Sequence, residues 1–261
     1  MKISLYPLYD FDSDLTPPIE IDNGVSIVIN EIDIGKINKI NVSNEDAHHI
    51  QQAEFCLSID EETIRPEKAS LLFILACRLL KRTKIFIRYR VNSANMVVKI
   101  RDDYPFVTAW NTTTFVKSNQ FKKISKLYIG LKKFSSLNKR TERASYFLSK
   151  AYRSRGWLES LLFYVCALET LTSASGKEKG LTEKFKTRIY NYVGYNKNKL
   201  DKIYNIRSEL VHGRYNYKSK KDNLKFNRMA EAACKKVFTK ILLTPEHLNA
   251  FANDSSRMKL F

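Results

Sequence analysis

The chain has 261 residues, 44% of them hydrophobic and 12% aromatic, and carries a formal net charge of +18, so a globular and strongly basic protein is expected. Its four cysteines lie far apart, without the spacing of a metal site or disulfide framework, which favours reduced thiols in a cytoplasmic protein. The first residues lack a signal-peptide apolar run, and the longest apolar run, 71–77, is too short to span a bilayer, so no membrane association is expected.

Charge is distributed unevenly along the chain. Residues 1–63 contain three basic and thirteen acidic side chains, a net of −10, and residues 64–261 contain the other 42 basic and 14 acidic ones, a net of +28. So basic a segment attracts polyanions, nucleic acid before membrane. One hypothesis is that the acidic segment covers the basic surface until it is displaced, which deleting the segment would test. The alternative is that two domains simply differ in charge.

The first part of the chain mixes strand and helix signals. The expected elements are short strands and turns in the first forty residues, including 25–29, a helix over 45–57, a helix over 66–82, and strands at 84–91 and 96–100. Asn44 before an acidic turn is typical of a helix cap, and Pro66 is typical of a first helical turn. These signals predict a mixed α/β domain.

From residue 119 onward the strand signals stop. The expected helices are 120–135, 139–154, 157–172, 181–193, 197–211, 223–243 and a short one from Pro245. A domain boundary is expected within 101–118, where both patterns are interrupted. The predicted fold class is therefore α+β, with a mixed α/β N-terminal domain over 1–115, acidic at its start, and an all-α helical bundle over 119–261.

The stretch 205–213 contains the chemistry-bearing pair of the sequence. Arg207 and His212, with four residues between them, lie in the last turns of a helix that ends at Gly213. A fixed positive charge and a proton carrier near neutral pH are what phosphodiester cleavage without a metal requires. A histidine in the last turn is also favoured by the helix dipole, which is the structural alternative.

Helical geometry separates these two side chains. The stripe expected to face the bundle core consists of Leu200, Ile203, Ile206 and Leu210. Arg207 lies about 60° from the centre of this stripe and His212 about 160°. Residues five apart differ by about 140° around a helix, so the two do not converge unaided. Either the last turn is distorted at Gly213, or a second copy supplies the missing partner across a two-fold axis.

The helix over 157–171 is apolar almost all round and should be central in the bundle. Glu169 lies on the same side of it as Leu158 and Leu162. A carboxylate there needs a cationic partner or takes up a proton, and Arg207 is the candidate. Whether the pair only orients the bundle or takes part in chemistry stays open at this point.

The helix with Ala167-Leu168-Glu169, the helix over 181–192 and the stretch 203–213 together resemble the HEPN superfamily, and its Apea-like family most closely, over about 138–243. Proteins of this family are α-helical bundles, commonly dimeric, in which the Arg and His act in metal-independent RNA cleavage, often in toxins and anti-phage systems. The resemblance implies that Arg207 holds the scissile phosphate and His212 moves the proton as the 2′-OH attacks. Glu169 and Ser208 would support them, although many active members have Asn, Asp or His where Ser208 stands.

The same resemblance implies the partners of the chain. They are RNA, a second copy through the helical domain, and a regulatory protein or phage trigger; no cofactor or metal is expected. Arg214, Tyr215 and Lys218 follow the motif and are candidate RNA contacts. Tyrosines 190, 192, 195, 204, 215 and 217, interleaved with lysines, are candidates for base stacking or, alternatively, for helix packing. A noncatalytic RNA-binding or sensor module is the alternative function.

Overall fold

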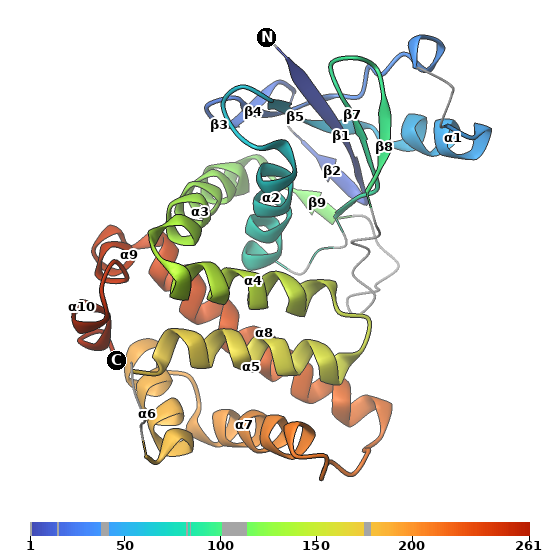
Figure 1. Cartoon of the computed structure of the whole chain (residues 1–261). Helices are drawn as coiled ribbons and strands as arrows, with labels where there is room; N and C mark the ends of the chain where they lie inside the picture. The colour runs from blue at the N-terminus through green and yellow to red at the C-terminus, as the bar shows by residue number, and fades with distance from the viewer. Residues whose placement is uncertain are drawn as a thin grey trace. The chain divides into compact units, whose positions relative to one another are not determined.

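The computed structural model describes residues 2–14, 16–37, 42–81, 83, 85–100, 114–174 and 179–261 (Figure 1). The fold class is α+β, as predicted: an antiparallel sheet with helices in residues 3–99 precedes a mostly helical region. The chain forms two compact units, Met1–Ile129 and Gly130–Phe261, and the division falls inside helix α3 (Ser118–Leu137). The boundary predicted within 101–118 lies mostly outside the described residues and stays a prediction.

A seven-stranded sheet dominates the first unit. Its strands are β1 (Ile3–Tyr9), β3 (Ile19–Asp22), β4 (Val25–Ile29), β5 (Phe55–Asp60), β6 (Phe86–Ile87), β7 (Tyr89–Val91) and β8 (Val97–Lys99). The strand order is β3-β4-β5-β1-β7-β8, with β6 also paired to β1, and these pairs are antiparallel. A separate parallel pair joins β2 (Phe11–Ser13) to β9 (Thr114–Val116). The predicted strands at 25–29, 84–91 and 96–100 are confirmed within these elements.

Opposite residues of an antiparallel ladder share a face, so Tyr6, Leu57 and Ile27 lie together on one side of the sheet. All three are fully buried. Helix α2 (Pro66–Leu80), buried over most of its length, packs against β5 (Figure 1). It starts with Pro66 in its first turn, as predicted.

One predicted helix of this unit is wrong in its second half. Helix α1 (Asn44–Gln52) ends at Gln52, and 55–57, predicted as helical, begin strand β5. This strand lies between β4 and β1 and is buried on both faces, so Phe55, Cys56 and Leu57 form an apolar run without alternation. The N-cap is Ser43 instead of Asn44: the Ser43 side chain accepts the backbone N–H of Asp46 at 3.1 Å.

The acidic segment 1–63 supplies strands β1, β3, β4 and β5 of this sheet. Of these, β1 and β5 pair with each other over six residues of each strand. Deleting the segment would remove these strands, so a deletion would test the stability of the first unit before it tested a cover over the basic surface.

The second unit is helical. After α3 come α4 (Lys139–Arg153), α5 (Trp157–Thr172), α6 (Leu181–Val193), α7 (Lys197–Val211), α8 (Lys220–Leu243), α9 (Pro245–Ala250) and α10 (Asp254–Met258). The predictions for α5, α6 and α7 are confirmed to the residue, whereas α10 was not predicted. Helix α5 contacts α4, α6, α7 and α8 and is central, as its all-round apolar sequence predicts. No helix in the described part of the chain is both long and apolar enough to cross a bilayer.

Candidate functional site

An ion pair joins α5 to α7 at the predicted site. Arg207 donates from Nη2 to Oε2 of Glu169 over 2.7 Å. The pair lies at the margin of the core, because the two side chains keep 24% and 20% of their exposure. The prediction that Arg207 is the cationic partner of Glu169 is therefore confirmed.

Tyr204 supports both members of this pair. Its ring lies under the guanidinium, with the centroid 5.9 Å from Cζ of Arg207, and its hydroxyl donates a hydrogen bond to the Glu169 carboxylate. The ring is held in turn by Phe185 of α6, at 4.9 Å between centroids. Sequence reasoning placed Tyr204 only among stacking candidates. Its position three residues before Arg207, on the same helix face, could have identified it.

The surroundings of the Glu169 carboxylate disfavour its charged form. Burial raises the pKa of Glu169 above its ordinary value, and Arg207 and the Tyr204 hydroxyl offset part of that rise. Burial, followed by the nearby Glu169 carboxylate, also raises the pKa of the Cys166 thiol. The site thus contains one permanent positive charge next to a carboxylate that depends on it.

Arg207 keeps hydrogen-bonding capacity beyond this pair. Its Nε is buried without a hydrogen-bond partner among the described residues, although the guanidinium also contacts the Cys166 thiol. A guanidinium has five N–H donors in a planar fork, which can bind a carboxylate and a phosphate oxygen together. The buried Nε is out of reach of a ligand, but the side chain as a whole stays 24% exposed, so an arginine oriented by Glu169 can still present N–H groups to an anion.

A surface pocket of about 390 Å³ adjoins Glu169 between the start of α4 and the end of α5. Its lining residues are Lys139, Arg140, Arg143, Glu169, Thr170 and Ser173. The three basic side chains come from the first two turns of α4, where the helix dipole also favours anions. None of the three was singled out from the sequence, because only the packing of α4 on α5 places them beside Glu169.

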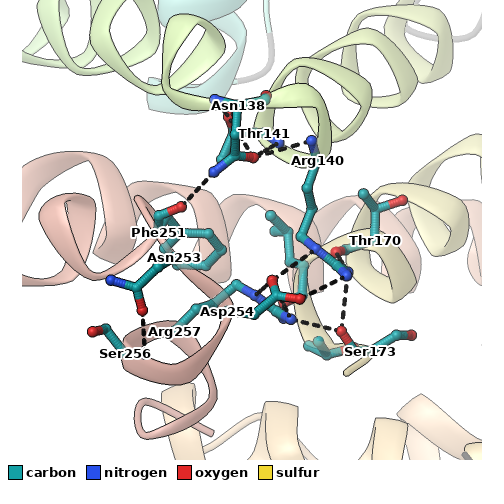
Figure 2. A network of polar contacts seen from close by, with 12 residues as sticks. Asn138, Arg140, Thr141, Thr170, Ser173, Phe251, Asn253, Asp254, Ser256 and Arg257 are labelled. Atoms are coloured by element: carbon teal, nitrogen blue, oxygen red, sulfur yellow. Dashed lines mark hydrogen bonds and ion pairs between the residues drawn. The ribbon is translucent and has the colours of Figure 1, made fainter. Parts of the chain in front are cut away.

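Three arginines from other elements cap the C-terminal end of α5. Arg140 donates to the carbonyls of Thr170 and Ser173, and Arg257 donates to that of Ser173 (Figure 2). Arg257 also donates to the carbonyl of Leu171, and Arg188 donates to that of Thr172. The carbonyl of Glu169 accepts the N–H of Ser173 at 2.9 Å. Every carbonyl that the helix end leaves without an intrahelical partner is therefore hydrogen-bonded.

This arginine cap is balanced by Asp254. Its carboxylate pairs with Nε of Arg140 at 3.2 Å and with Nη2 of Arg257 at 3.2 Å (Figure 2). Arg257 is only 1% exposed, and burial, followed by the charge of Arg140, lowers its pKa. Its guanidinium nitrogens are all engaged with backbone carbonyls or Asp254, so the cap is a structural feature.

His212 lies apart from this cluster, at the C-cap of α7. Its backbone N–H donates to the Ser208 carbonyl at 3.0 Å, whereas its ring is exposed and forms no hydrogen bond or ion pair with any described residue. Gly213 follows in the left-handed conformation (φ 67°), and the N–H of Arg214 donates to the Glu209 carbonyl at 2.8 Å. The described contacts join Arg207 to Glu169 but do not join Arg207 to His212.

The remaining predicted residues differ in how accessible they are. Ser208 is half-buried, and Arg214 and Lys218 are exposed. Tyr215 is 9% exposed, and its hydroxyl donates to Oδ1 of Asn223 at 2.6 Å, so its ring offers little surface to a base. Tyr192, Tyr195 and Tyr204 are also buried, which leaves Tyr190 and Tyr217 as the exposed members of the tyrosine set.

Comparison of the chain with family models, with curated proteins and with solved structures finds no match. The HEPN resemblance therefore depends on the motif-bearing stretches 167–169, 181–192 and 203–213.

Proposed function

We propose that the chain is a metal-independent endoribonuclease of the HEPN type, acting in the cytoplasm as a toxin or anti-phage effector. One observation carries the proposal: Arg207 is oriented by Glu169 while its side chain stays 24% exposed, and the exposed ring of His212 follows at the end of the same helix. This supplies an anion-binding group and a proton carrier at a solvent-accessible surface.

In the proposed reaction Arg207 binds the non-bridging oxygens of the scissile phosphate and stabilises the charge that develops on them. His212 accepts the proton of the 2′-OH as that oxygen forms a bond to phosphorus and the bond from phosphorus to the 5′-oxygen breaks. The departing 5′-oxygen takes up a proton from water, and the protonated His212 returns its proton to water. The products are a 2′,3′-cyclic phosphate end and a 5′-hydroxyl end, and the need for a 2′-OH restricts the substrate to RNA.

A homodimer through the helical domain is part of the proposal. Arg207 and His212 are about 140° apart around α7, so a second copy facing the first would bring the histidine of one copy toward the arginine of the other. Glu169 and Tyr204 would hold the arginine in place in each half.

A noncatalytic RNA-binding or sensor module is the second candidate. It is favoured by the pairing of Arg207 with Glu169 and by the absence of a contact between Arg207 and His212 among the described residues. In this reading the basic residues 64–261 bind RNA, or a regulatory protein or phage trigger, without cleavage.

The deciding experiment is cleavage of total RNA in EDTA by wild type, His212→Ala and Arg207→Ala, with the dimer content of each measured. His48→Ala is the matched control, because His48 is an exposed histidine on α1, in the other unit. We expect wild type and the control to cut RNA and both motif variants to lose activity while remaining folded. Equal cutting by His212→Ala would contradict the role of His212 and the HEPN-type mechanism, and equal RNA binding by all variants without cutting would establish the second candidate.

A further inference from the structure

An exposed tyrosine follows the motif in the segment between α7 and α8. Tyr217 exposes 86% of its surface, the largest fraction of any large hydrophobic side chain in the described part of the chain. A single exposed aromatic residue is ordinary on a protein surface. What distinguishes Tyr217 is its setting among another tyrosine and several lysines.

The segment that carries Tyr217 is anchored to α8. The Tyr215 hydroxyl donates to Oδ1 of Asn223 at 2.6 Å, and Nδ2 of Asn223 donates to the carbonyl of Lys218 at 3.2 Å. Ser219 then caps α8. The rings of Tyr215 and Tyr217 meet edge to face at 5.9 Å. Tyr217 is therefore supported by Tyr215, and the high exposure of its ring leaves surface available to a ligand.

Lysines accompany aromatic rings on both sides of Ser219. Nζ of Lys218 lies 5.4 Å from the ring centroid of Phe226, and Nζ of Lys220 lies 5.5 Å from that of Trp157, the first residue of α5. Residues 214–225 contain five basic side chains and one acidic one, a net of +4. The segment combines an open aromatic ring with ammonium groups held close to it in sequence.

A single strand of nucleic acid matches this chemistry. Its bases stack on aromatic side chains with little dependence on sequence, and its phosphates are bound by lysines. A duplex offers the same phosphates but hides the faces of its bases, so an exposed ring discriminates between the two. A membrane surface fits less well, because interfacial binding uses a helix with a broad apolar face and this segment exposes one large ring.

We propose that residues 214–221, together with Trp157, form a binding site for single-stranded nucleic acid in which a base stacks on Tyr217 and Lys218 and Lys220 contact the flanking phosphates. Tyr217 follows His212 by five residues, at most about 17 Å of extended chain. The site therefore lies next to the proposed cleavage motif. The identification of the strand as RNA rests on the proposed function.

The test measures binding without cleavage. A fluorescein-labelled 12-nucleotide RNA of mixed sequence, with 2′-O-methyl groups that prevent 2′-OH attack, is titrated with the full chain and followed by anisotropy. Tyr217→Ala is expected to weaken binding about tenfold and Tyr217→Phe less than about twofold, because the ring is kept. Tyr190→Ala is the matched control, since Tyr190 is 46% exposed and has Nζ of Lys197 4.8 Å from its ring centroid.

Salt dependence separates stacking from charge. Tyr217→Ala should leave the slope of log K against log salt unchanged, whereas Lys218→Ala should reduce its magnitude by about 0.7, the value for one phosphate of a single strand. DNA of the same sequence tests whether the sugar matters to binding. A duplex of the same sequence should bind without dependence on Tyr217.

The proposal is overturned if wild type fails to bind the single strand, if Tyr217→Ala binds as wild type does, or if Tyr190→Ala loses as much. Tyr217-dependent binding to phosphatidylserine vesicles instead of the oligonucleotide would assign the surface to a membrane. If binding does not depend on Tyr217 but cleavage still depends on His212, this binding site is ruled out and the nuclease is not. Tyr217-dependent binding without any cleavage removes the nuclease and keeps this site.

Discussion

Helices α5 and α7 end in different ways. The end of α5 is closed by side chains from α4, α6 and α10, and the arginine that reaches deepest, Arg257, is fully buried. The end of α7 is closed by its own backbone, through His212, Gly213 and the N–H of Arg214. An end that needs no tertiary partner can stay exposed to solvent, and the candidate chemistry lies at that end.

Arg257, at the end of α5, and Arg207, on α7, also differ in how much of each guanidinium a ligand can reach. The guanidinium of Arg257 is engaged with carbonyls and Asp254, so little of it can serve a ligand. Arg207 has one carboxylate partner, and its side chain stays 24% exposed against 1% for that of Arg257. Solvent exposure and the number of committed donors, more than the presence of an ion pair, separate a structural arginine from a candidate anion-binding one.

Arg257→Ala should have the largest effect on stability. It leaves the carbonyls of Leu171 and Ser173 without this donor, and we expect the free energy of unfolding to fall by about 3 kcal/mol. Urea denaturation followed by Trp157 fluorescence, with Trp110 replaced by Phe, measures the helical unit. Arg143→Ala, an exposed arginine on α4, should change stability by less than about 0.5 kcal/mol. Equal effects of the two variants would show that the cap is not a stabilising feature.

Arg207→Ala should cost less, about 2 kcal/mol at pH 7, because it leaves the half-buried Glu169 carboxylate without its cation. The loss should shrink toward acidic pH, since the carboxylate can then take up a proton. Denaturation at pH 7 and pH 5 tests this. A loss as large as that of Arg257→Ala would contradict the distinction between the two arginines.

Gly213→Ala should cost about 1 kcal/mol, because an alanine is strained at φ 67°. Gly213→Asn is the matched control, since asparagine adopts this conformation more readily and should cost only a few tenths of a kcal/mol. Thermal or urea denaturation of both variants measures the difference. If the two substitutions were equally tolerated, the local backbone cap would not be what ends α7.

The smallest effect concerns pH. The raised pKa of Glu169 means that the folded state binds a proton more readily than the unfolded state, so this residue stabilises the fold most below its ordinary pKa. That contribution disappears as pH rises through the folded pKa. The unfolding free energy of wild type minus that of Glu169→Gln should therefore decrease as pH rises from about 4.5. A difference that grows with pH would mean that Arg207 outweighs burial.

Sequence reasoning was strongest where one helix carries the whole signal. The bounds of α5, α6 and α7 follow from apolar periodicity and from glycine breaks, and a carboxylate on the apolar α5 predicts its pairing with Arg207. It failed at β5, because a strand buried on both faces has no alternation that distinguishes it from a helix.

The arginine cap had no comparable signal. Arg140 and Arg257 lie 33 and 84 residues from Ser173, whose carbonyl both of them bind. The acceptors are backbone carbonyls, which every residue has, so no side-chain pattern in α5 predicts these contacts. The basic side chains of Lys139 and Arg143 beside Glu169 were missed for the same reason, because they depend on how α4 packs on α5.

The distance in sequence between Ser173 and Arg257 also orders events during synthesis. At translation rates of about 5–20 residues per second, roughly 4 to 17 s separate the appearance of the two residues. Until then the last carbonyls of α5 can be satisfied only by water, by Arg140 or by Arg188. The central helix α5 is thus synthesised early, but the carbonyls at its C-terminal end gain the Arg257 hydrogen bonds late. The helical unit acquires its final packing only after residue 257 has been added to the chain.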